Sequence, residues 1–293
     1  MSQVIENKFK CGHVAIVGSP NVGKSTLLNA IIRKKISIVS HKVQTTRTRI
    51  QAILSKDSSQ IIFIDTPGIF KPRKLRERPL VREAWKSLDQ ANVIIFVLDA
   101  TKEISDVSLA LLDEVSNSNI ELIVVLNKID LVDKEELLSL IDKIKVNNAV
   151  HNIFLISALK YDGVLKLLDD VIKKIPYGEW IYPKEMSTNI SDMAIAEEFT
   201  REKIYQYVHK EIPYSIIIDT ENWIEKSKNV IQVHQNIYVT NNNHKKIILG
   251  KDGEKIKQIS IESRLDIEQY LNKKVHLYLY IKLRKNNYIP NIS

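Results

Sequence analysis

The sequence predicts an α/β domain with a mostly parallel sheet and helices on both faces, followed by a smaller α+β domain. Short apolar runs alternate with amphipathic stretches in the first half of the chain, which is typical of the first architecture. A different order of helices and strands follows the stretch YGEWIYPKEMSTNIS, which has no clear period. We therefore expect domains at residues 1–178 and 194–293, joined by a linker at 179–193.

Five short apolar runs in the first half are predicted to be buried strands: His13–Val17, Gln60–Ile64, Val93–Leu98, Leu122–Leu126 and Asn152–Ile156. Between these strands, apolar residues recur with the spacing of a helix, which predicts helices at Lys24–Ile32, Val81–Leu88, Val107–Ser116, Lys134–Ile144 and Val164–Ile175. Ile36–Leu54 differs, because it runs from a polar, Thr-rich loop into an edge-strand pattern. Buried strands separated by helices indicate a mostly parallel sheet with both faces covered.

The second half follows another order, helix–strand–strand–helix–helix–strand. In that order, the predicted segments are Ala194–Tyr207, Pro213–Asp219, Asn229–Tyr238, Lys246–Ile259, Ser263–Leu271 and Val275–Leu283. A turn is expected at residues 241–243. This succession indicates an α+β domain rather than a continuation of the first sheet.

Composition narrows the class of protein. The single cysteine, Cys11, allows no internal disulfide and favours a reducing cytosol. The N-terminus lacks the apolar core of a secretory signal, and no apolar run could cross a bilayer, so we expect a cytoplasmic protein. Net charge is +8, and from Arg201 onward sixteen Lys and Arg face ten Asp and Glu. This surplus favours a polyanion partner, nucleic acid more than lipid, although general lysine enrichment remains the alternative.

The stretch GSPNVGKS directly follows the first predicted strand and precedes the first predicted helix, and it fits G-x-x-x-x-G-K-[ST] in full. Glycines let successive backbone N–H groups face one anion, and the helix N-terminus adds its positive end. Lys24 can reach the outer phosphates, and Ser25 can ligate Mg²⁺. The expected phosphate-binding residues are Gly18, Ser19, Asn21, Val22, Gly23, Lys24, Ser25 and Thr26.

The tetrapeptide NKID, which follows the run Leu122–Leu126, predicts that the base is guanine. The Asp130 carboxylate can accept from both guanine N1–H and the 2-amino group, a pair of donors that adenine lacks. Asn127 would tie this loop to the phosphate loop, and the Lys128 stem would cover the base face. The segment Ser157, Ala158 and Leu159 follows the next strand, where a backbone N–H could reach guanine O6.

The tetrapeptide DTPG follows the run Gln60–Ile64. Asp65 is placed to hold Mg²⁺ through water, and the Gly68 N–H is placed to sense the γ-phosphate. Taken alone, this segment could be a plain Pro-Gly turn. Its position in the chain, between GSPNVGKS and the two later segments NKID and Ser157–Leu159, argues against that alternative.

These motifs resemble the translation-factor-related GTPases and, within them, the Era family, which has a TrmE–Era–EngA-type G domain and a C-terminal type II KH domain. The resemblance covers nearly the whole chain. It includes Q-T-T-R-T in the Thr-rich loop, E-I-P-Y-S at Glu211–Ser215 and I-L-G-K-D-G at Ile248–Gly253. The predicted fold class is therefore a P-loop GTPase domain followed by an α+β type II KH domain.

The resemblance implies a slow GTPase, because Ile69 stands where related enzymes carry a water-orienting glutamine. Asn21 is expected to help bind K⁺ beside the phosphates, with support of a tight loop as the alternative. The first switch is expected at Val39–Arg49, with Thr46 favoured over Thr45 as the Mg²⁺ ligand. The predicted catalytic residues are Lys24, Thr46, Gly68 and Asn21, and the predicted metal ligands are Ser25, Thr46 and Asp65.

The stretch Gly250–Gly253 has the G-x-x-G spacing of a KH loop, in which glycines allow close approach to a sugar-phosphate backbone. Asp252 departs from expectation, because it puts a negative charge where a phosphate should bind. The predicted RNA-binding residues are Lys245, Lys246, Gly250, Lys251, Asp252, Gly253, Lys255 and Lys257. The basic run KPRKLRERP after Gly68 fits a solvated mobile loop and an RNA contact equally well.

By resemblance, the protein is expected to be a monomer that binds 16S ribosomal RNA near its 3′ end and assists assembly of the small ribosomal subunit, using GTP, Mg²⁺ and, by extension, K⁺. Two rivals remain open. One is a membrane-docked switch whose basic half contacts anionic lipid peripherally. The other is an RNA-binding assembly protein in which the nucleotide is purely structural.

Overall fold

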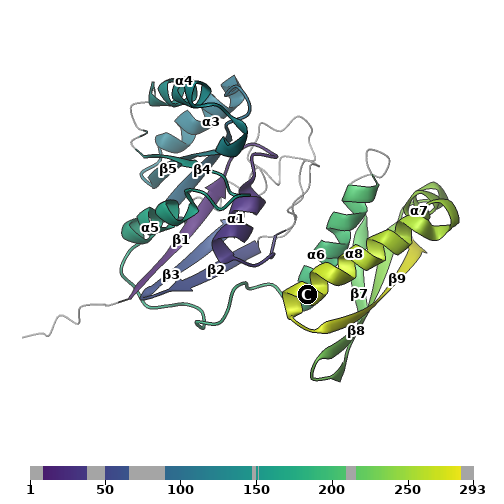
Figure 1. Cartoon of the computed structure of the whole chain (residues 1–293). Coiled ribbons are helices and arrows are strands. Elements are labelled where there is room, and N and C mark those ends of the chain that lie inside the picture. Colours follow the sequence, from purple (N-terminus) through teal and green to yellow (C-terminus); the bar gives the residue numbers. More distant parts are fainter. Residues whose placement is uncertain are drawn as a thin grey trace, which may run out of the picture. The chain divides into compact units, whose positions relative to one another are not determined.

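The computed structural model describes residues 9–37, 50–65, 90–146, 150, 152–208 and 216–284 (Figure 1). The chain divides into two compact units between Asn189 and Ile190, a point that falls inside the predicted 179–193 linker. Several predicted features lie outside the described residues: the first switch segment, the basic run KPRKLRERP, the helix Val81–Leu88 and the Glu211–Ser215 motif. Within the described residues, the helices are too short or too polar to cross a membrane.

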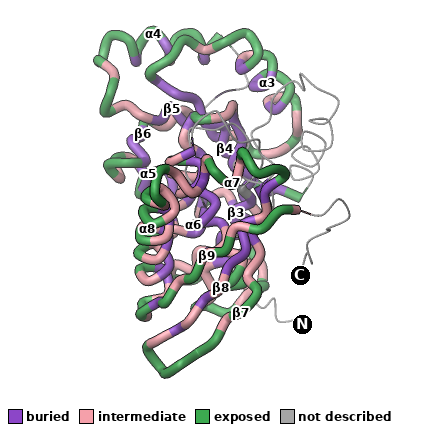
Figure 2. Tube along the Cα trace, turned by 90° about the vertical axis from the view of Figure 1, so that its right-hand side faces the viewer, coloured by how far each residue is buried: buried purple, intermediate pink, exposed green. Residues whose placement is uncertain are grey.

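The first unit is built on a six-stranded sheet in the order β2-β3-β1-β4-β5-β6. Its strands are β1 (Lys10–Val17), β2 (Ile50–Lys56), β3 (Ser59–Asp65), β4 (Val93–Asp99), β5 (Glu121–Asn127) and β6 (Ile153–Ile156). All neighbouring pairs are parallel except β2 with β3, so the five predicted strands and the edge strand are confirmed. Every residue of β4 is buried, as expected from the unbroken apolar run Val93–Leu98 that makes up all of the strand except its last residue (Figure 2).

Helices cover both faces of this sheet. One layer contains α3 (Asp106–Ser116) and α4 (Lys134–Lys145), whose leucines pack on alternate residues of β1, β4 and β5, such as Val17 and Phe96. The intervening residues of those strands face the other layer, α1 (Lys24–Ile32) and α5 (Val164–Lys174), which lie together in Figure 1. This alternation is what a two-sided burial of a parallel sheet requires.

The sheet fixes where functional residues gather. The strands β1, β3, β4, β5 and β6 all run in the same direction, so the loops that follow them emerge at one edge. Ligands of open α/β sheets bind at this carboxyl edge. The phosphate loop, Asp65, the NKID loop and the Ser157 loop all leave the sheet there.

The segment leaving the first unit is bound to the sheet rather than suspended in solvent. The buried Gln60 side chain accepts hydrogen bonds from Ile181 N and Tyr182 N, both at 2.9 Å, and donates to Tyr182 O at 2.8 Å. Further along, Ile53 N donates to Ser187 O at 2.9 Å. Part of the 179–193 segment is therefore held against β2 and β3, with a single antiparallel bridge between Ala52 and Thr188.

The second unit contains a three-stranded sheet, β7-β8-β9, in which β8 pairs antiparallel with β7 and parallel with β9. Its elements in chain order are α6 (Asp192–Tyr207), β7 (Ile217–Ser227), β8 (Val230–Val239), α7 (Asn242–Leu249), α8 (Glu254–Leu271) and β9 (Lys274–Leu283). The predicted element order is confirmed. A core that includes Ile204, Ile237 and Ile259 joins helices to sheet.

Two boundaries in this unit differ from the sequence prediction. The expected turn at 241–243 is instead the start of α7, because Asn241 Oδ1 accepts from His244 N and caps that helix. The expected helix 246–259 is broken at the glycines Gly250 and Gly253, both at positive φ. The helix that follows, α8, then runs without interruption to Leu271.

Gly12 in β1 offers a test of packing between the sheet and α5. A Cβ added at Gly12 would lie 2.7 Å from Cβ of Ile175, whose branched side chain cannot swing away. We expect Gly12→Ala to lower the free energy of unfolding by about 1–3 kcal/mol, measured by urea denaturation.

Gly178→Ala is the matched control, because its added Cβ would meet Cys11 at an ordinary 3.9 Å. It should change stability by no more than about 0.5 kcal/mol. Equal destabilisation by the two substitutions would contradict the close packing assigned to Gly12.

Candidate nucleotide-binding and RNA-binding sites

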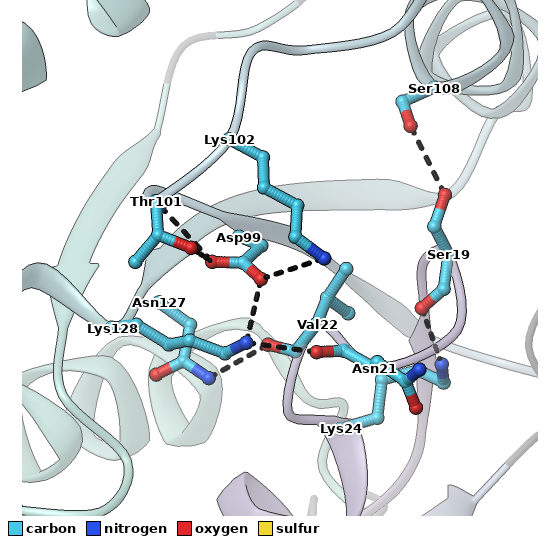
Figure 3. Close-up of polar contacts among 10 residues, drawn as sticks. All are labelled: Ser19, Asn21, Val22, Lys24, Asp99, Thr101, Lys102, Ser108, Asn127 and Lys128. Carbon is cyan, nitrogen blue, oxygen red and sulfur yellow. Dashed lines mark hydrogen bonds and ion pairs between the residues drawn. The ribbon is translucent and has the colours of Figure 1, made fainter. Parts of the chain in front are cut away.

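The phosphate loop between β1 and α1 is curled around its own lysine. Lys24 Nζ donates to Gly18 O at 3.1 Å and to Ser19 O at 3.0 Å, and this lysine is 8% exposed (Figure 3). Gly18, Asn21 and Gly23 all have positive φ, the last at 98°. Gly23 has no side chain to cap α1, and the positive end of a helix is a favourable place for an anion.

Asn127, at the end of β5, connects three segments. Its Nδ2 donates to Val22 O at 2.9 Å, and its Oδ1 accepts from Ala158 N at 3.0 Å. The residue is 2% exposed. A Cβ at Gly23 would lie 2.2 Å from this Nδ2, so the glycine also makes room for the amide. The phosphate loop, the NKID loop and the Ser157 loop are thus held as one body.

Lys128 also reaches back to the phosphate loop. Its Nζ donates to Asn21 O at 3.0 Å and to Asp99 Oδ2 at 2.6 Å (Figure 3). Burial opposes ionisation of Asp99, but hydrogen bonds from Lys128 and Thr101 outweigh it and hold the pKa of the carboxyl below its usual value. Asp99 is therefore charged at neutral pH.

The predicted base reader Asp130 lies in the one-turn helix Ile129–Leu131, after Lys128, and is exposed. Ser157 and Ala158 are buried, whereas Leu159 is 77% exposed. Ser157 Oγ accepts from Lys160 N at 3.1 Å, which closes the turn after β6. An exposed carboxylate beside a rigid, buried loop suits a residue that meets a base at the surface.

The predicted metal ligands are placed by two neighbouring parallel strands. Ser25 lies in the first turn of α1, directly after the β1 loop. Asp65 is the last residue of β3, which pairs with β1, so both ligands belong to the same edge of the sheet. The side chain of Asp65 lies outside the described part of the chain, as do Thr45, Thr46 and Gly68.

The G-x-x-G loop joins α7 to α8 in the second unit. Gly250 and Gly253 have φ of 74° and 79°, and Asp252 between them has φ 51°. A Cβ at Gly250 would lie 2.5 Å from Cβ of Lys255, so only glycine fits there. Gly253 precedes α8 as Gly23 precedes α1 and offers that helix no side-chain cap, while the first amide of α8, Glu254 N, donates to Lys251 O.

The predicted RNA-binding lysines surround this loop. Lys246, Lys251 and Lys257 are exposed, while Lys245 and Lys255 are half-buried. Asp252 is exposed on the same loop. The loop thus offers several cations and one opposing carboxylate to an anionic backbone, so its net attraction for phosphate is moderate.

Sequence reasoning missed two residues of the nucleotide site. Asp99 lies one residue beyond the predicted strand Val93–Leu98 and was given no role, and Ser108 was assigned only to a helix. Ser108 Oγ lies 3.1 Å from Ser19 Oγ and ties α3 to the phosphate loop. A polar residue at the carboxyl end of a buried strand was the available signal for Asp99, whereas Ser108 carried none.

Comparisons with known proteins agree with this division. The profile described as 50S ribosome-binding GTPase matches residues 13–128, and the KH domain profile matches residues 203–287. GTPase Era of Bradyrhizobium sp. (strain ORS 278) is 41% identical over 284 residues, which cover 97% of this chain and 92% of that protein. The chain belongs to the Era family of GTPases.

Other Era proteins support this membership. GTPase Era of Rhizobium meliloti (strain 1021) is 40% identical over 94% of this chain and 88% of its own. A crystal structure of Era in complex with MgGDPNP and nucleotides 1506–1542 of 16S ribosomal RNA matches with a TM-score of 0.87 and 36% identity, covering 97% of this chain and 95% of that one. A single-residue variant of Aquifex aeolicus Era, bound to GDP·AlF4⁻, matches with the same values. The predicted fold class is confirmed.

Asn127→Ala tests whether one amide holds the Era-type site together. The substitution removes both side-chain bonds and leaves buried Val22 O and Ala158 N without them. We expect the free energy of unfolding, measured by urea denaturation without nucleotide, to fall by about 1–3 kcal/mol.

Asn117→Ala is the control, because Asn117 Nδ2 donates to Asp113 O at an exposed helix end. It should cost no more than about 0.5 kcal/mol. A comparable loss of unfolding free energy in both variants would mean that the Asn127 side chain does not hold the three loops together.

Proposed function

We propose that this protein is a GTP-hydrolysing switch that binds 16S ribosomal RNA near its 3′ end and assists maturation of the small ribosomal subunit. The observation that carries the proposal is the connection of phosphate loop and base loop through Asn127, in a chain whose Era relatives match it over nearly its whole length. The complex of Era with MgGDPNP and 16S ribosomal RNA supports both ligands.

The geometry fits GTP and Mg²⁺. In the proposed complex, the uncapped amides of α1 and the ammonium of Lys24 receive the phosphates, and Asp130 accepts from the edge of guanine. Ser25 and Asp65 belong to one edge of the sheet and would hold Mg²⁺, with Thr46 as the proposed switch ligand. A bound Mg²⁺ would neutralise charge on the β- and γ-phosphates.

Hydrolysis in this proposal relies on electrostatics rather than on a side-chain base. Ile69 cannot polarise water, so the unassisted rate should be low. Asn21 sits at φ 66° at the tip of the phosphate loop, and its carbonyl is held by Lys128. We assign its side chain to binding K⁺, which would supply positive charge beside the phosphates.

The RNA-binding end is proposed to be the Gly250–Gly253 loop with its lysines. Its two glycines permit close approach of a sugar-phosphate backbone, and the N-terminus of α8 directly follows the loop. The rival in which this half binds lipid is disfavoured, because the lysines gather at a G-x-x-G loop rather than along an amphipathic helix face. We also propose that the protein is a monomer in the cytoplasm. A peripheral membrane contact is retained in the proposal, but not as the role of the G-x-x-G loop.

Potassium should accelerate GTP turnover. We expect purified protein to release phosphate about tenfold or more faster in KCl than in NaCl at equal ionic strength. Asn21→Gly, which keeps the positive φ without strain, should abolish this difference while retaining GDP binding.

Lys24→Ala serves as the control for contaminating activity and should be inactive in both salts. Absence of turnover in either salt would favour the rival in which the nucleotide is purely structural. Equal turnover in both salts would overturn the assignment of Asn21.

The decisive measurement is the affinity of a labelled 16S 3′-end oligonucleotide for the GDP-bound protein and for its complex with a non-hydrolysable GTP analogue, at one salt concentration. We expect about fivefold or more tighter binding in the GTP form, as a coupling of the two sites requires. Equal binding would mean that the halves are uncoupled on naked RNA.

Asp252→Asn is the matched variant for this assay. Asparagine tolerates the observed φ of 51°, and the substitution removes one negative charge from the loop. Affinity should rise about equally in both nucleotide states. Unchanged affinity for the oligonucleotide would mean that the RNA does not contact the Gly250–Gly253 loop.

A further inference from the structure

Asp99 is a buried carboxylate that the four nucleotide motifs do not include. It is the last residue of β4 and lies opposite Asn127 in the register with β5. Ala100 N donates to Asn127 O at 2.9 Å, so the two strand ends are locked together. The Asp99 side chain is 4% exposed. Burying a charge here is costly unless specific partners compensate for it.

The two oxygens of Asp99 have different partners. Oδ1 accepts from Thr101 Oγ1 at 2.7 Å and from Thr101 N at 3.1 Å, which fixes the orientation of the carboxylate. Oδ2 faces Lys128 Nζ at 2.6 Å (Figure 3). A second lysine, Lys102, approaches the same oxygen only to 3.7 Å and is 66% exposed. The carboxylate is therefore built to hold one ammonium group.

That ammonium group is shared with the phosphate loop. Lys128 Nζ also donates to Asn21 O at 3.0 Å, so a single cation joins the end of β4 to the loop before α1. The neutral carbonyl alone would hold the lysine weakly, because ordering a long lysine side chain costs rotamer freedom. The charged partner offsets this cost before any ligand arrives.

We infer that Asp99 is a positioning residue for the guanine nucleotide: it holds the Lys128 ammonium against the phosphate loop, so that the lysine stem is extended where the face of the base will lie. The inference rests on the proposed function. Preorganisation of this kind strengthens binding by removing an entropy cost that the nucleotide would otherwise bear.

This role differs from that of Asp130 in a measurable way. Asp130 is proposed to read the edge of guanine, where the 2-amino group distinguishes guanine from hypoxanthine. A lysine stem covers the face of the ring, which the two bases share. Asp99 should therefore control the affinity for GDP and IDP by the same factor and leave their ratio unchanged.

The test is Asp99→Asn in the full-length protein, with Kd and dissociation rate measured for fluorescent GDP and IDP. Asparagine preserves the volume and an acceptor for Thr101 but removes the charge that faces Lys128. We expect Kd to rise about tenfold for both nucleotides, mostly through faster dissociation. Lys102→Gln is the control on the same carboxylate and should change Kd less than about twofold.

A double-mutant cycle with Lys128→Met separates positioning from general support. If Asp99 acts through Lys128, adding Asp99→Asn to Lys128→Met should weaken GDP binding by less than about twofold further. Should Asp99→Asn fail to fold, Thr101→Val replaces it, because it loosens the carboxylate without removing the charge. That variant should weaken GDP and IDP binding equally, by about two- to threefold.

Several results would overturn the inference: unchanged GDP affinity in folded Asp99→Asn, an altered GDP-to-IDP ratio, or independent, multiplying effects of the two substitutions in the cycle. Failure of the wild-type protein to bind GDP would instead refute the proposed function. The two failures are thus distinguishable, because the inference is tested only by changes relative to a wild-type protein that binds.

Discussion

One buried carboxamide, that of Asn127, sets the geometry on which the nucleotide site depends. A carboxamide carries a donor and an acceptor on the same rigid plane, and Asn127 uses both, to Val22 O and from Ala158 N. A carboxylate of the same shape could accept from Ala158 but could not donate to Val22. The three loops that follow β1, β5 and β6 therefore have fixed positions relative to one another before a ligand binds, which is what preorganised recognition needs.

The two candidate sites use the same local physics in different units. Gly23 precedes α1 and Gly253 precedes α8, and neither glycine caps its helix with a side chain, so each helix begins at a loop that is proposed to meet phosphate. The two loops differ in the residues that surround them. The first loop is tightened by Lys24 and by Asn127 and is held rigid. In the second loop Asp252 reduces the positive charge, which suits a backbone ligand that must also be released.

Patterns with a local period were predictable from the sequence. The helix Lys24–Ile32 has the expected bounds, and each predicted core strand is present within a few residues, because burial on two faces produces an unbroken apolar run. The polar remainder of β7, TENWIEKS at residues 220–227, was missed because two register shifts in its pairing with β8 interrupt the alternation of apolar and polar residues. The start of α7 was missed because an asparagine run also suits a turn.

Contacts made across the sheet could not be predicted in this way. The role of Asp99 depends on its register opposite Asn127 and on a lysine that folds back to the phosphate loop, neither of which leaves a trace in the local sequence. The switch residues Thr46 and Gly68 remain predictions, since they lie outside the described residues. The candidate site was therefore predictable as a set of motifs but not as a network.

The hydrogen bond from Ile53 N to Ser187 O has a consequence for solubility. β2 is the antiparallel strand at the end of its sheet, and such a strand exposes backbone groups that can pair with a foreign strand. The segment around Ser187 and Thr188 occupies the middle of that edge, next to Ala52 and Ile53. The stretch that leads out of the first unit thereby blocks sheet extension, so lengthening or loosening it would expose the protein to aggregation through β2.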